Sequence, residues 1–217
     1  MSSQQARDGE AAALVDLDAY PLLDLDSAAA RELIERQARS IRETGAAELS
    51  GFLRADGLAR CREDAEALAP KAHWSRGKSG PYLEIPEPIW PEGHPRLHLE
   101  PFSVGAIAYD LFPENSPLRR LYEWDPLMHL IGAILGRSPL YRYADPLGAL
   151  NVAVMKEGDS LEWHFDQTDF VVSLALQDSS EGGDFEVAPR IRSAEDERYD
   201  AVGRVLGGNH QGVVRLP

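Results

Sequence analysis

Cysteine is nearly absent from the sequence, since Cys61 is the only one in 217 residues. An internal disulfide is therefore excluded, which fits a protein of a reducing compartment. Cys61 is predicted to be a small, half-buried residue of a helix, because no base that could activate its thiol can be read from the sequence. A thiol nucleophile is thus not expected.

Basic residues are also scarce relative to acidic ones. The chain has 22 Lys and Arg against 36 Asp and Glu, which gives a net charge of −14. Nucleic acids and anionic membrane surfaces are both recognised through clustered Lys and Arg. Neither a nucleic acid nor a membrane is therefore an expected partner.

Long apolar runs and a secretory signal are missing as well. No stretch approaches the length of a membrane span. The first residues, Met1–Ala13, contain no basic region followed by an apolar run. Together with the single cysteine, these absences predict a cytoplasmic protein.

The chain is predicted to consist of a disordered tail, residues 1–14, and one domain, residues 15–217. The composition is that of an ordinary globular protein, with 43% hydrophobic and 27% charged residues. Amphipathic patterns with end signals predict the helices, and short apolar runs between turn residues predict the strands. The expected helices are 27–45, 56–69, 117–123, 125–135 and 193–205, and the expected strands are 46–53, 103–110, 140–143, 150–155, 170–176 and 212–216.

The segment from Lys71 to Pro101 is rich in Pro and Gly and lacks a periodic pattern. A long irregular segment inside a compact domain is usually a functional lid or a covering loop. We expect either a lid over the mouth of a barrel or a simple cover. His94 and His98 lie in this segment, but Pro95 between them opposes the helix that would aim both rings at one metal, so surface histidines are expected.

The stretch from Ala149 to Pro189 organises the rest of the chain. Its apolar runs flank His164-Phe165-Asp166, and glycines punctuate its ends, which indicates strands joined by turns, one of them carrying this tripeptide. Because successive strand side chains alternate between faces, His164 and Asp166 are expected to project together. An imidazole and a carboxylate on one face are two of the three ligands of the facial triad that binds non-haem Fe(II). On its own, the pair also fits an exposed strand face without a metal.

The run 151–177 and the Gly-Gly-Asp-Phe-Glu at 182–186 resemble the core of the Fe(II)/2-oxoglutarate-dependent dioxygenases. The likeness extends from about His94 to the end of the chain and is closest to the bacterial branch of free amino-acid hydroxylases and halogenases. It implies an α+β fold with a double-stranded β-helix core, of the jelly-roll or cupin-like type, behind N-terminal helices. The order of helices followed by short strands points to the same fold. The resemblance implies Fe(II) and 2-oxoglutarate as cofactors, O2 as co-substrate and a small molecule, an amino acid, as substrate.

The resemblance also implies roles for single residues. His164 and Asp166 are the metal ligands, and Asn151 matches a position whose amide hydrogen-bonds 2-oxoglutarate; a strand residue facing a turn is the other interpretation of Asn151. Halogenating members carry Gly where Asp166 stands, so hydroxylation is favoured over the halogenase alternative. A non-catalytic cupin-like binding module is the third interpretation. An amino acid needs a cation for its carboxylate and acceptors for its ammonium, and the candidates for these contacts are Gln167, Asp169 and Arg190, with Arg192 as the alternative to Arg190.

The family pattern continues into two further strands, which supply a distal His ligand and an Arg for 2-oxoglutarate. His210 is the only histidine after the pair, and its Gly- and Asn-rich surroundings predict a solvated turn rather than a strand that aims a ligand inward. Arg215 follows only five residues later and does not match the family's Arg. The resemblance therefore implies a dioxygenase whose C-terminal core strands are missing, with an incomplete site, at most weak iron affinity and no turnover.

Overall fold

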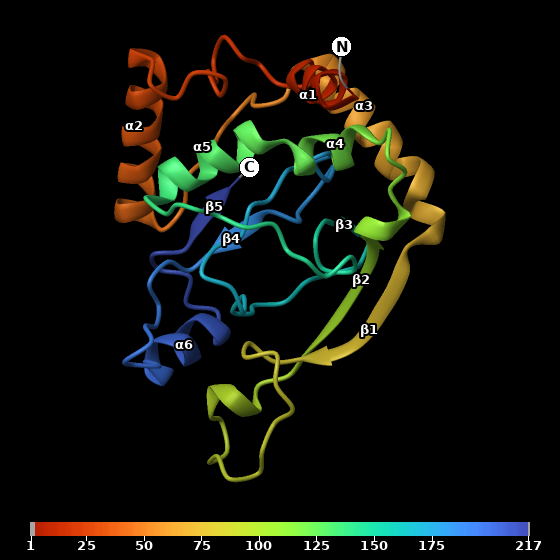
Figure 1. Cartoon of the computed structure of the whole chain (residues 1–217). Coiled ribbons are helices and arrows are strands. Elements are labelled where there is room, and N and C mark those ends of the chain that lie inside the picture. The colour runs from red at the N-terminus through yellow and green to blue at the C-terminus, as the bar shows by residue number, and fades with distance from the viewer. Residues whose placement is uncertain (1–2, 217) are drawn as a thin grey trace. The chain divides into compact units, whose positions relative to one another are not determined.

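The computed structural model describes residues 3–216, and the fold is α+β, with helices and two small sheets (Figure 1). The α+β class predicted from the order of helices and strands is confirmed. The chain forms two compact units: unit 1 is Met1–Ala72 with Ile107–Val152, and unit 2 is His73–Ala106 with Ala153–Pro217. None of the described helices combines the length and apolar character that crossing a membrane requires.

Helix α1 (Ser3–Ala12) begins unit 1. The sequence predicts a disordered tail over residues 1–14, whereas the described part of that stretch is helical and leads to Leu14, which is fully buried. Glu10 of this helix also forms an ion pair at 3.2 Å with Arg120, in the helix Pro117–Glu123 of the same unit. The first residues are thus packed through a single large apolar side chain, which a composition argument cannot detect.

Helix α2 (Ala28–Thr44) has the ends that the sequence predicts. The Ser27 hydroxyl accepts a hydrogen bond from the Ala30 amide at 3.2 Å, which satisfies one of the free amides of the first turn. Gly45 ends the helix in the left-handed conformation, with φ 81°, which glycine adopts without steric cost. An N-cap of this kind is worth about 1 kcal/mol.

Helix α3 (Ala55–Leu68) buries the face that carries Cys61 and continues into the 3-10 turn η1 (Ala69–Lys71). Asp56, the first residue of the predicted helix, lies in the first turn, where a carboxylate interacts favourably with the helix dipole. Burial, followed by the nearby Asp64, raises the pKa of the Cys61 thiol to about 11. The cysteine is therefore protonated at neutral pH and structural, as predicted, although it is buried more completely than expected.

Helices α4 (Pro117–Glu123) and α5 (Asp125–Leu135) have the predicted bounds. Trp124 lies between them at the N-cap position of α5 and is buried, and Gly136 ends α5 in the left-handed conformation. Helix α5 therefore packs through the apolar side chains that its sequence pattern marks. Among the largest fully buried side chains of this unit are Trp124, Phe112, Leu14, Leu130 and Val15.

Glu123, the last residue of α4, is enclosed by two hydrogen-bond donors. Nε of Arg119 donates to its Oε1 at 2.8 Å, and the hydroxyl of Tyr109, in the 3-10 turn η3 (Tyr109–Leu111), donates to the same oxygen. Burial disfavours the charged carboxylate, but these hydrogen bonds and the charge of Arg119 outweigh it and lower the pKa of Glu123.

This lowered pKa predicts a pH-dependent contribution to stability. Because the pKa in the folded protein lies below the ordinary value of 4.5, Glu123 stabilises the fold above that value, and the contribution is lost as the pH falls through the lower folded value. Glu123→Gln is therefore expected to flatten the loss of unfolding free energy below about pH 4.5, measured by urea unfolding at a series of pH values. The exposed Glu66 of α3 supplies the control, since Glu66→Gln removes a carboxylate whose ion pair with Arg62 lies open to solvent. An unchanged profile for Glu123→Gln would contradict this explanation.

The first sheet has the strand order β1-β2-β3, and β1 runs antiparallel to β2 with His73 opposite Ala106 and Ser79 opposite Glu100. The second sheet is a two-stranded antiparallel pair, β4 with β5. In chain order the remaining elements are β1 (His73–Ser79), η2 (Pro95–Leu97), β2 (Glu100–Ala108), β3 (Asn151–Val154), β4 (Phe185–Val187), α6 (Tyr199–Leu206) and β5 (Val214–Leu216).

Several predicted strands are absent. Residues 46–53 form only an isolated bridge at Leu53, residues 140–143 form no strand, and residues 170–176 also lie outside any strand, with Val171 and Val172 54% and 58% exposed. Conversely, β1 occupies part of the segment predicted to be irregular. A strand forms only where a neighbouring strand can pair with it, and a local apolar run does not specify that partner.

Candidate functional site

The chain turns just before the His-x-Asp pair, at Gly158, whose φ of 83° is one that glycine adopts readily. Two backbone hydrogen bonds then hold the following segment. The Ser103 amide donates to the Ser160 carbonyl at 3.1 Å, and the Phe165 amide donates to the Pro81 carbonyl at 2.8 Å. The segment that carries the pair is thus tied at both ends although it belongs to no sheet.

His164 and Asp166 bring their side chains together, as the alternation predicts. Nε2 of His164 lies 3.6 Å from Oδ1 of Asp166, and the two side chains are 36% and 55% exposed. Phe165 between them is half-buried, with its ring 5.2 Å from that of Tyr82. Metal–ligand bonds of about 2.0–2.2 Å allow nitrogen and oxygen atoms at this separation to share one cation.

The imidazole of His164 is oriented by a backbone group. Its Nδ1 lies 2.7 Å from the carbonyl oxygen of Glu162, which can only accept, so Nδ1 carries the proton. In the neutral ring, Nε2 then keeps its lone pair on the side of Asp166. Metal-binding histidines commonly donate their second ring N–H to a carbonyl in this way, which fixes the tautomer and the ring orientation. The donor pair therefore fits two positions of a divalent cation.

A third protein ligand is not assembled within residues 3–216, where no group of three His, Cys, Asp or Glu side chains is placed to hold one metal ion. His210 lies in a turn region, as predicted, and its ring is 5.8 Å from that of Trp163 in an edge-on contact. Arg215 pairs with Glu186 at 2.8 Å. Donors other than these would have to complete a coordination sphere at the pair.

Two carboxyl groups, those of Glu100 and Glu162, lie near the His-x-Asp pair, since Glu162 is two residues before His164. Nε2 of His98 lies 2.8 Å from Oε1 of Glu100, and the Ser160 hydroxyl donates to Glu162 at 2.7 Å. A hydrogen bond from Glu162 lowers the pKa of Glu100. The Ser160 hydrogen bond favours the charged form of Glu162, but burial and the neighbouring Glu100 outweigh it and raise the pKa of Glu162. The two neighbouring carboxyls therefore have pKa values shifted in opposite directions.

Sequence reasoning missed these carboxyl groups. Glu162 precedes His164 by two residues and Asp166 by four, so the same period of two would have placed it beside them. Glu100 carried no such signal, because it comes from β2, 62 residues earlier than Glu162. His98, expected on the surface, is half-buried and partnered.

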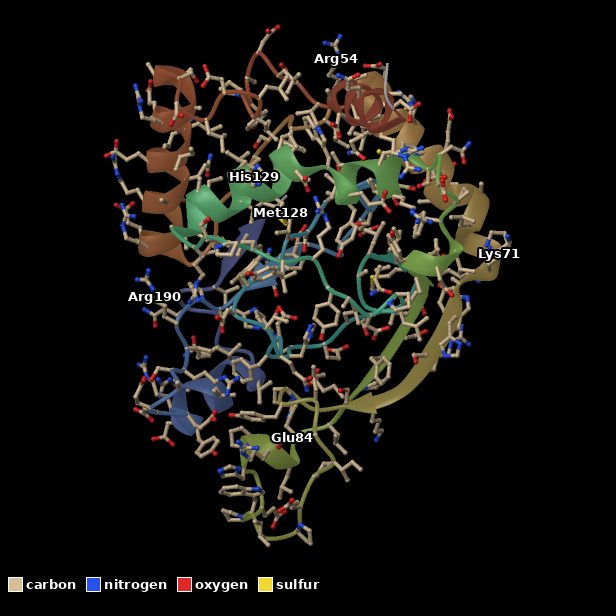
Figure 2. The ribbon with its side chains drawn as sticks, viewed as in Figure 1. Arg54, Lys71, Glu84, Met128, His129 and Arg190 are labelled. Atoms are coloured by element: carbon tan, nitrogen blue, oxygen red, sulfur yellow. The ribbon has the colours of Figure 1, made fainter. Side chains whose placement is uncertain are left out.

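The other predicted site residues are placed as follows. Asn151 lies on β3 at the end of unit 1, and its side-chain amide donates at 3.1 Å to the carbonyl four residues earlier. Gln167 and Asp169 are exposed and follow the pair directly. Arg190, which is labelled in Figure 2, has a positive φ of 52°. Its carbonyl accepts a hydrogen bond from the guanidinium of Arg198 at 3.2 Å. Their assignments to cosubstrate and substrate stay predictions.

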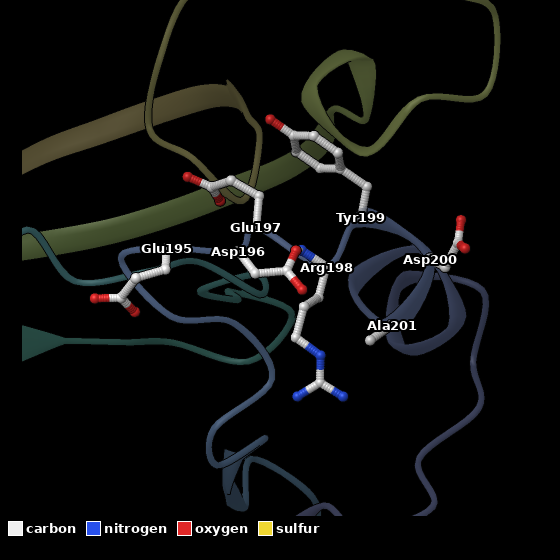
Figure 3. A pocket seen from close by; sticks show the side chains of 7 residues that line it. All are labelled: Glu195, Asp196, Glu197, Arg198, Tyr199, Asp200 and Ala201. Atoms are coloured by element: carbon white, nitrogen blue, oxygen red, sulfur yellow. The ribbon is translucent and has the colours of Figure 1, made fainter.

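Two open hollows share Tyr199 and Asp200 in unit 2. One, of about 630 Å³, is lined by residues 195–201 (Figure 3), and the other, of about 540 Å³, is lined by residues 91–95 and part of α6. Neither is lined by His164 or Asp166. The candidate site is therefore defined by the geometry of its donor atoms and not by a described cavity.

Comparisons of the chain with protein-family models, with curated proteins and with solved structures give no match. A functional assignment therefore depends on the resemblance carried by the motif and on the geometry at His164 and Asp166.

Proposed function

We propose that His164 and Asp166 are protein ligands of a ferrous iron site, and that the chain serves the Fe(II)/2-oxoglutarate-dependent hydroxylation of a small free amino acid or similar metabolite. The observation that supports this best is the 3.6 Å approach of Nε2 to Oδ1, with Nδ1 held by a carbonyl. The proposal includes a double-stranded β-helix core of the jelly-roll or cupin-like type. It also includes a cytoplasmic location, which suits the single buried cysteine.

Different residues of the chain would bind and orient the metal ligands, 2-oxoglutarate and the amino acid. With 2-oxoglutarate and O2, the iron supplies the oxidation that converts an unactivated C–H bond to C–OH, with release of succinate and CO2. The Glu162 carbonyl holds the proton of the His164 ring on Nδ1, so that Nε2 remains a ligand. Asn151 is the candidate for a hydrogen bond to 2-oxoglutarate. The candidates for the ammonium and carboxylate of the amino acid are Gln167, Asp169 and Arg190.

Cation titration tests the site directly. The protein is titrated with Fe(II) under anaerobic conditions and with Mn(II) as a spectroscopic probe. Weak binding is expected, because the pair supplies two protein ligands, and His164→Ala or Asp166→Ala should each lower the affinity about tenfold or more. The control is His129→Ala, since His129 is an exposed histidine of α5 (Figure 2). Equal affinities for the unchanged protein and His164→Ala would refute the iron site.

Product analysis separates the related functions. Because residues 3–216 assemble no third protein ligand, little succinate is expected from this chain alone, and robust succinate formation would mean that another donor completes the site. A hydroxylated product in chloride buffer would identify the hydroxylase, and a chlorinated product the halogenase, which Asp166 disfavours because its carboxylate fills the halide position. Little or no succinate is expected from this chain in either case, so cation binding that 2-oxoglutarate leaves unchanged, followed in the Mn(II) spectrum, would favour the cupin-like binding module.

A further inference from the structure

Residues 80–99, named the strap here, join β1 to β2 and contain no regular element apart from η2. The two ends of the strap meet, since a Cβ added to Gly80 would lie 2.5 Å from the carbonyl oxygen of His98. Its middle is exposed, with Ile85 and Ile89 90% and 73% exposed. A surface loop with closed ends is held in place mainly by its side chains, so the contacts of those side chains decide where it lies.

Arg96 joins the strap to the first residue of α6. Its Nε donates to the hydroxyl of Tyr199 at 3.1 Å, and its Nη1 lies 2.5 Å from Glu84 within the strap. Its guanidinium carbon lies 4.4 Å from the centre of the Tyr82 ring, within range of a cation–π interaction. The Arg96 side chain is only 21% exposed, so these interactions are screened by water less than those of a surface ion pair.

Glu197 connects Arg96 to a second arginine. Nη1 of Arg192 donates to both carboxylate oxygens of Glu197, at 3.0 and 3.1 Å, and Nη2 of Arg96 lies 3.7 Å from the same carboxylate. The side chains of Glu197 and Tyr199 leave the backbone on one side and that of Arg198 on the other (Figure 3). Both arginines near Glu197 are thus neutralised by a carboxylate within the protein.

The same cluster contacts the residue between the two proposed ligands. The guanidinium of Arg192 lies 4.1 Å from the centre of the Phe165 ring, and the Tyr82 ring packs 5.2 Å from it. The Phe165 amide also donates to the carbonyl of Pro81, the second residue of the strap, at 2.8 Å. Burial, followed by Glu197, raises the pKa of Tyr82 to about 12, so its hydroxyl stays protonated and Tyr82 acts as a packing group. Phe165 is therefore held by both its backbone and its ring.

We propose that Arg96 is a positioning residue: together with Tyr82, Arg192 and Glu197, here called the clasp, it holds the strap against Phe165 and so fixes the backbone from which His164 and Asp166 project. Arg96 acts through Tyr82 and Phe165 and not on a ligand, because its charge is met by Glu84 and Glu197. The role of the clasp in holding Phe165 is inferred from these contacts and does not depend on the proposed iron site. The effect on cation binding rests on the proposed iron site.

Hydrogen exchange tests the clasp without any metal. In the unchanged protein the Phe165 amide is expected to be protected by its hydrogen bond to Pro81. In Arg96→Ala, exchange at Phe165 and cleavage within the strap by a nonspecific protease should both be about tenfold faster or more. Arg96→Lys keeps the charge but loses the planar set of donors, so an intermediate rate is expected. Glu197→Gln removes the negative charge that pairs with both Arg96 and Arg192. It should therefore also speed exchange at Phe165, although Arg96 itself is unchanged.

Cation affinity tests the positioning role. Arg96→Ala is expected to weaken Mn(II) binding about tenfold, while Arg96→Lys restores part of it. Arg62→Ala is the matched control, since Arg62 forms an exposed ion pair with Glu66 within α3, and it should change neither exchange at Phe165 nor affinity. Unchanged fluorescence of the buried Trp124 checks that unit 1 is still folded in each variant.

Each outcome decides one part of the proposal. Unchanged exchange at Phe165 in both Arg96→Ala and Glu197→Gln would overturn the clasp. Faster exchange with unchanged cation affinity, in a protein whose affinity depends on His164, would overturn the positioning role and leave a purely structural cluster. If His164→Ala has no effect on cation binding, the iron site fails, and exchange at Phe165 then decides the clasp by itself.

Discussion

Leu14→Ala is expected to lower the free energy of unfolding by about 2–5 kcal/mol, the range for removing a large aliphatic side chain from a packed interior. Leu14 is fully buried and follows α1 directly. Its carbonyl accepts a hydrogen bond from the Arg54 amide at 2.9 Å, so the surrounding backbone has little freedom to collapse into the space left behind. Urea unfolding followed by the fluorescence of the buried Trp124 measures the change within the same unit.

The control for this substitution is Leu23→Ala. Leu23 is 65% exposed, and its truncation should change the free energy of unfolding by no more than about 0.5 kcal/mol. An effect of Leu14→Ala as small as that of Leu23→Ala would mean that residues 1–14 are not packed in solution and that the disordered tail predicted from the sequence is correct.

Gly57→Ala is expected to destabilise the protein by about 2 kcal/mol, because an overpacking cost of about 3 kcal/mol is offset in part by a gain of about 1 kcal/mol in helix propensity. A Cβ at position 57 would lie 2.4 Å from the carbonyl oxygen of Leu14 and 2.9 Å from its Cα. These are backbone atoms, which cannot move aside as the end of a flexible side chain can. The carbonyl is also the one that accepts from the Arg54 amide, so relief of the clash strains that hydrogen bond. Alanine gains about 1 kcal/mol in helix propensity over glycine, which is less than the expected cost of the clash.

Gly9→Ala is expected to change the free energy of unfolding in the opposite direction. Gly9 lies within α1, and a Cβ there would meet no atom within 4 Å. Only the gain in helix propensity remains, so this variant should be stabilised by up to about 1 kcal/mol in the same urea experiment. If Gly57→Ala were as stable as Gly9→Ala, the close approach of α3 to the Leu14 backbone would be refuted.

The helices of unit 1 could be predicted because their signals are local. Ser27 and Gly45 mark the ends of α2 by side-chain chemistry and backbone freedom, and neither depends on the rest of the fold. The two helices on either side of Trp124 also begin and end where the sequence predicts. Helix α1 was not predicted, since its packing depends on the burial of Ala11 and of Leu14 just beyond its end, which the composition of the segment does not indicate.

The strands were harder to predict. The runs 46–53, 140–143 and 170–176 have the composition of strands, yet none of them becomes one, because a ladder needs a partner that a local pattern does not name. Within residues 140–143, Arg142 bonds instead to the Tyr122 carbonyl and to Asp125, both at 2.8 Å. Contacts of the side chain, and not backbone pairing, hold that segment.

The sequence predicted the His164 and Asp166 pair of the candidate site but not the residues that hold it. His164 and Asp166 lie together as the two-residue period predicts, although their segment forms no strand. The clasp could not be predicted, since Arg96 and Tyr199 are 103 residues apart and no pattern in either segment refers to the other. Contacts of this kind appear only once the fold is known.

Residues 170–176 have a consequence for how copies of the protein behave toward one another. Within the described chain, no backbone hydrogen bond reaches residues 171–176, and a short uncharged run rich in Val and Leu is the kind that pairs edge to edge between molecules. Nine carboxylates and no Lys or Arg lie between positions 157 and 189, so neighbouring molecules repel one another across this region. Salt shortens the reach of that repulsion from about 10 Å at 0.1 M to about 3 Å at 1 M. High ionic strength therefore removes the main barrier to self-association, and dilute buffers preserve it.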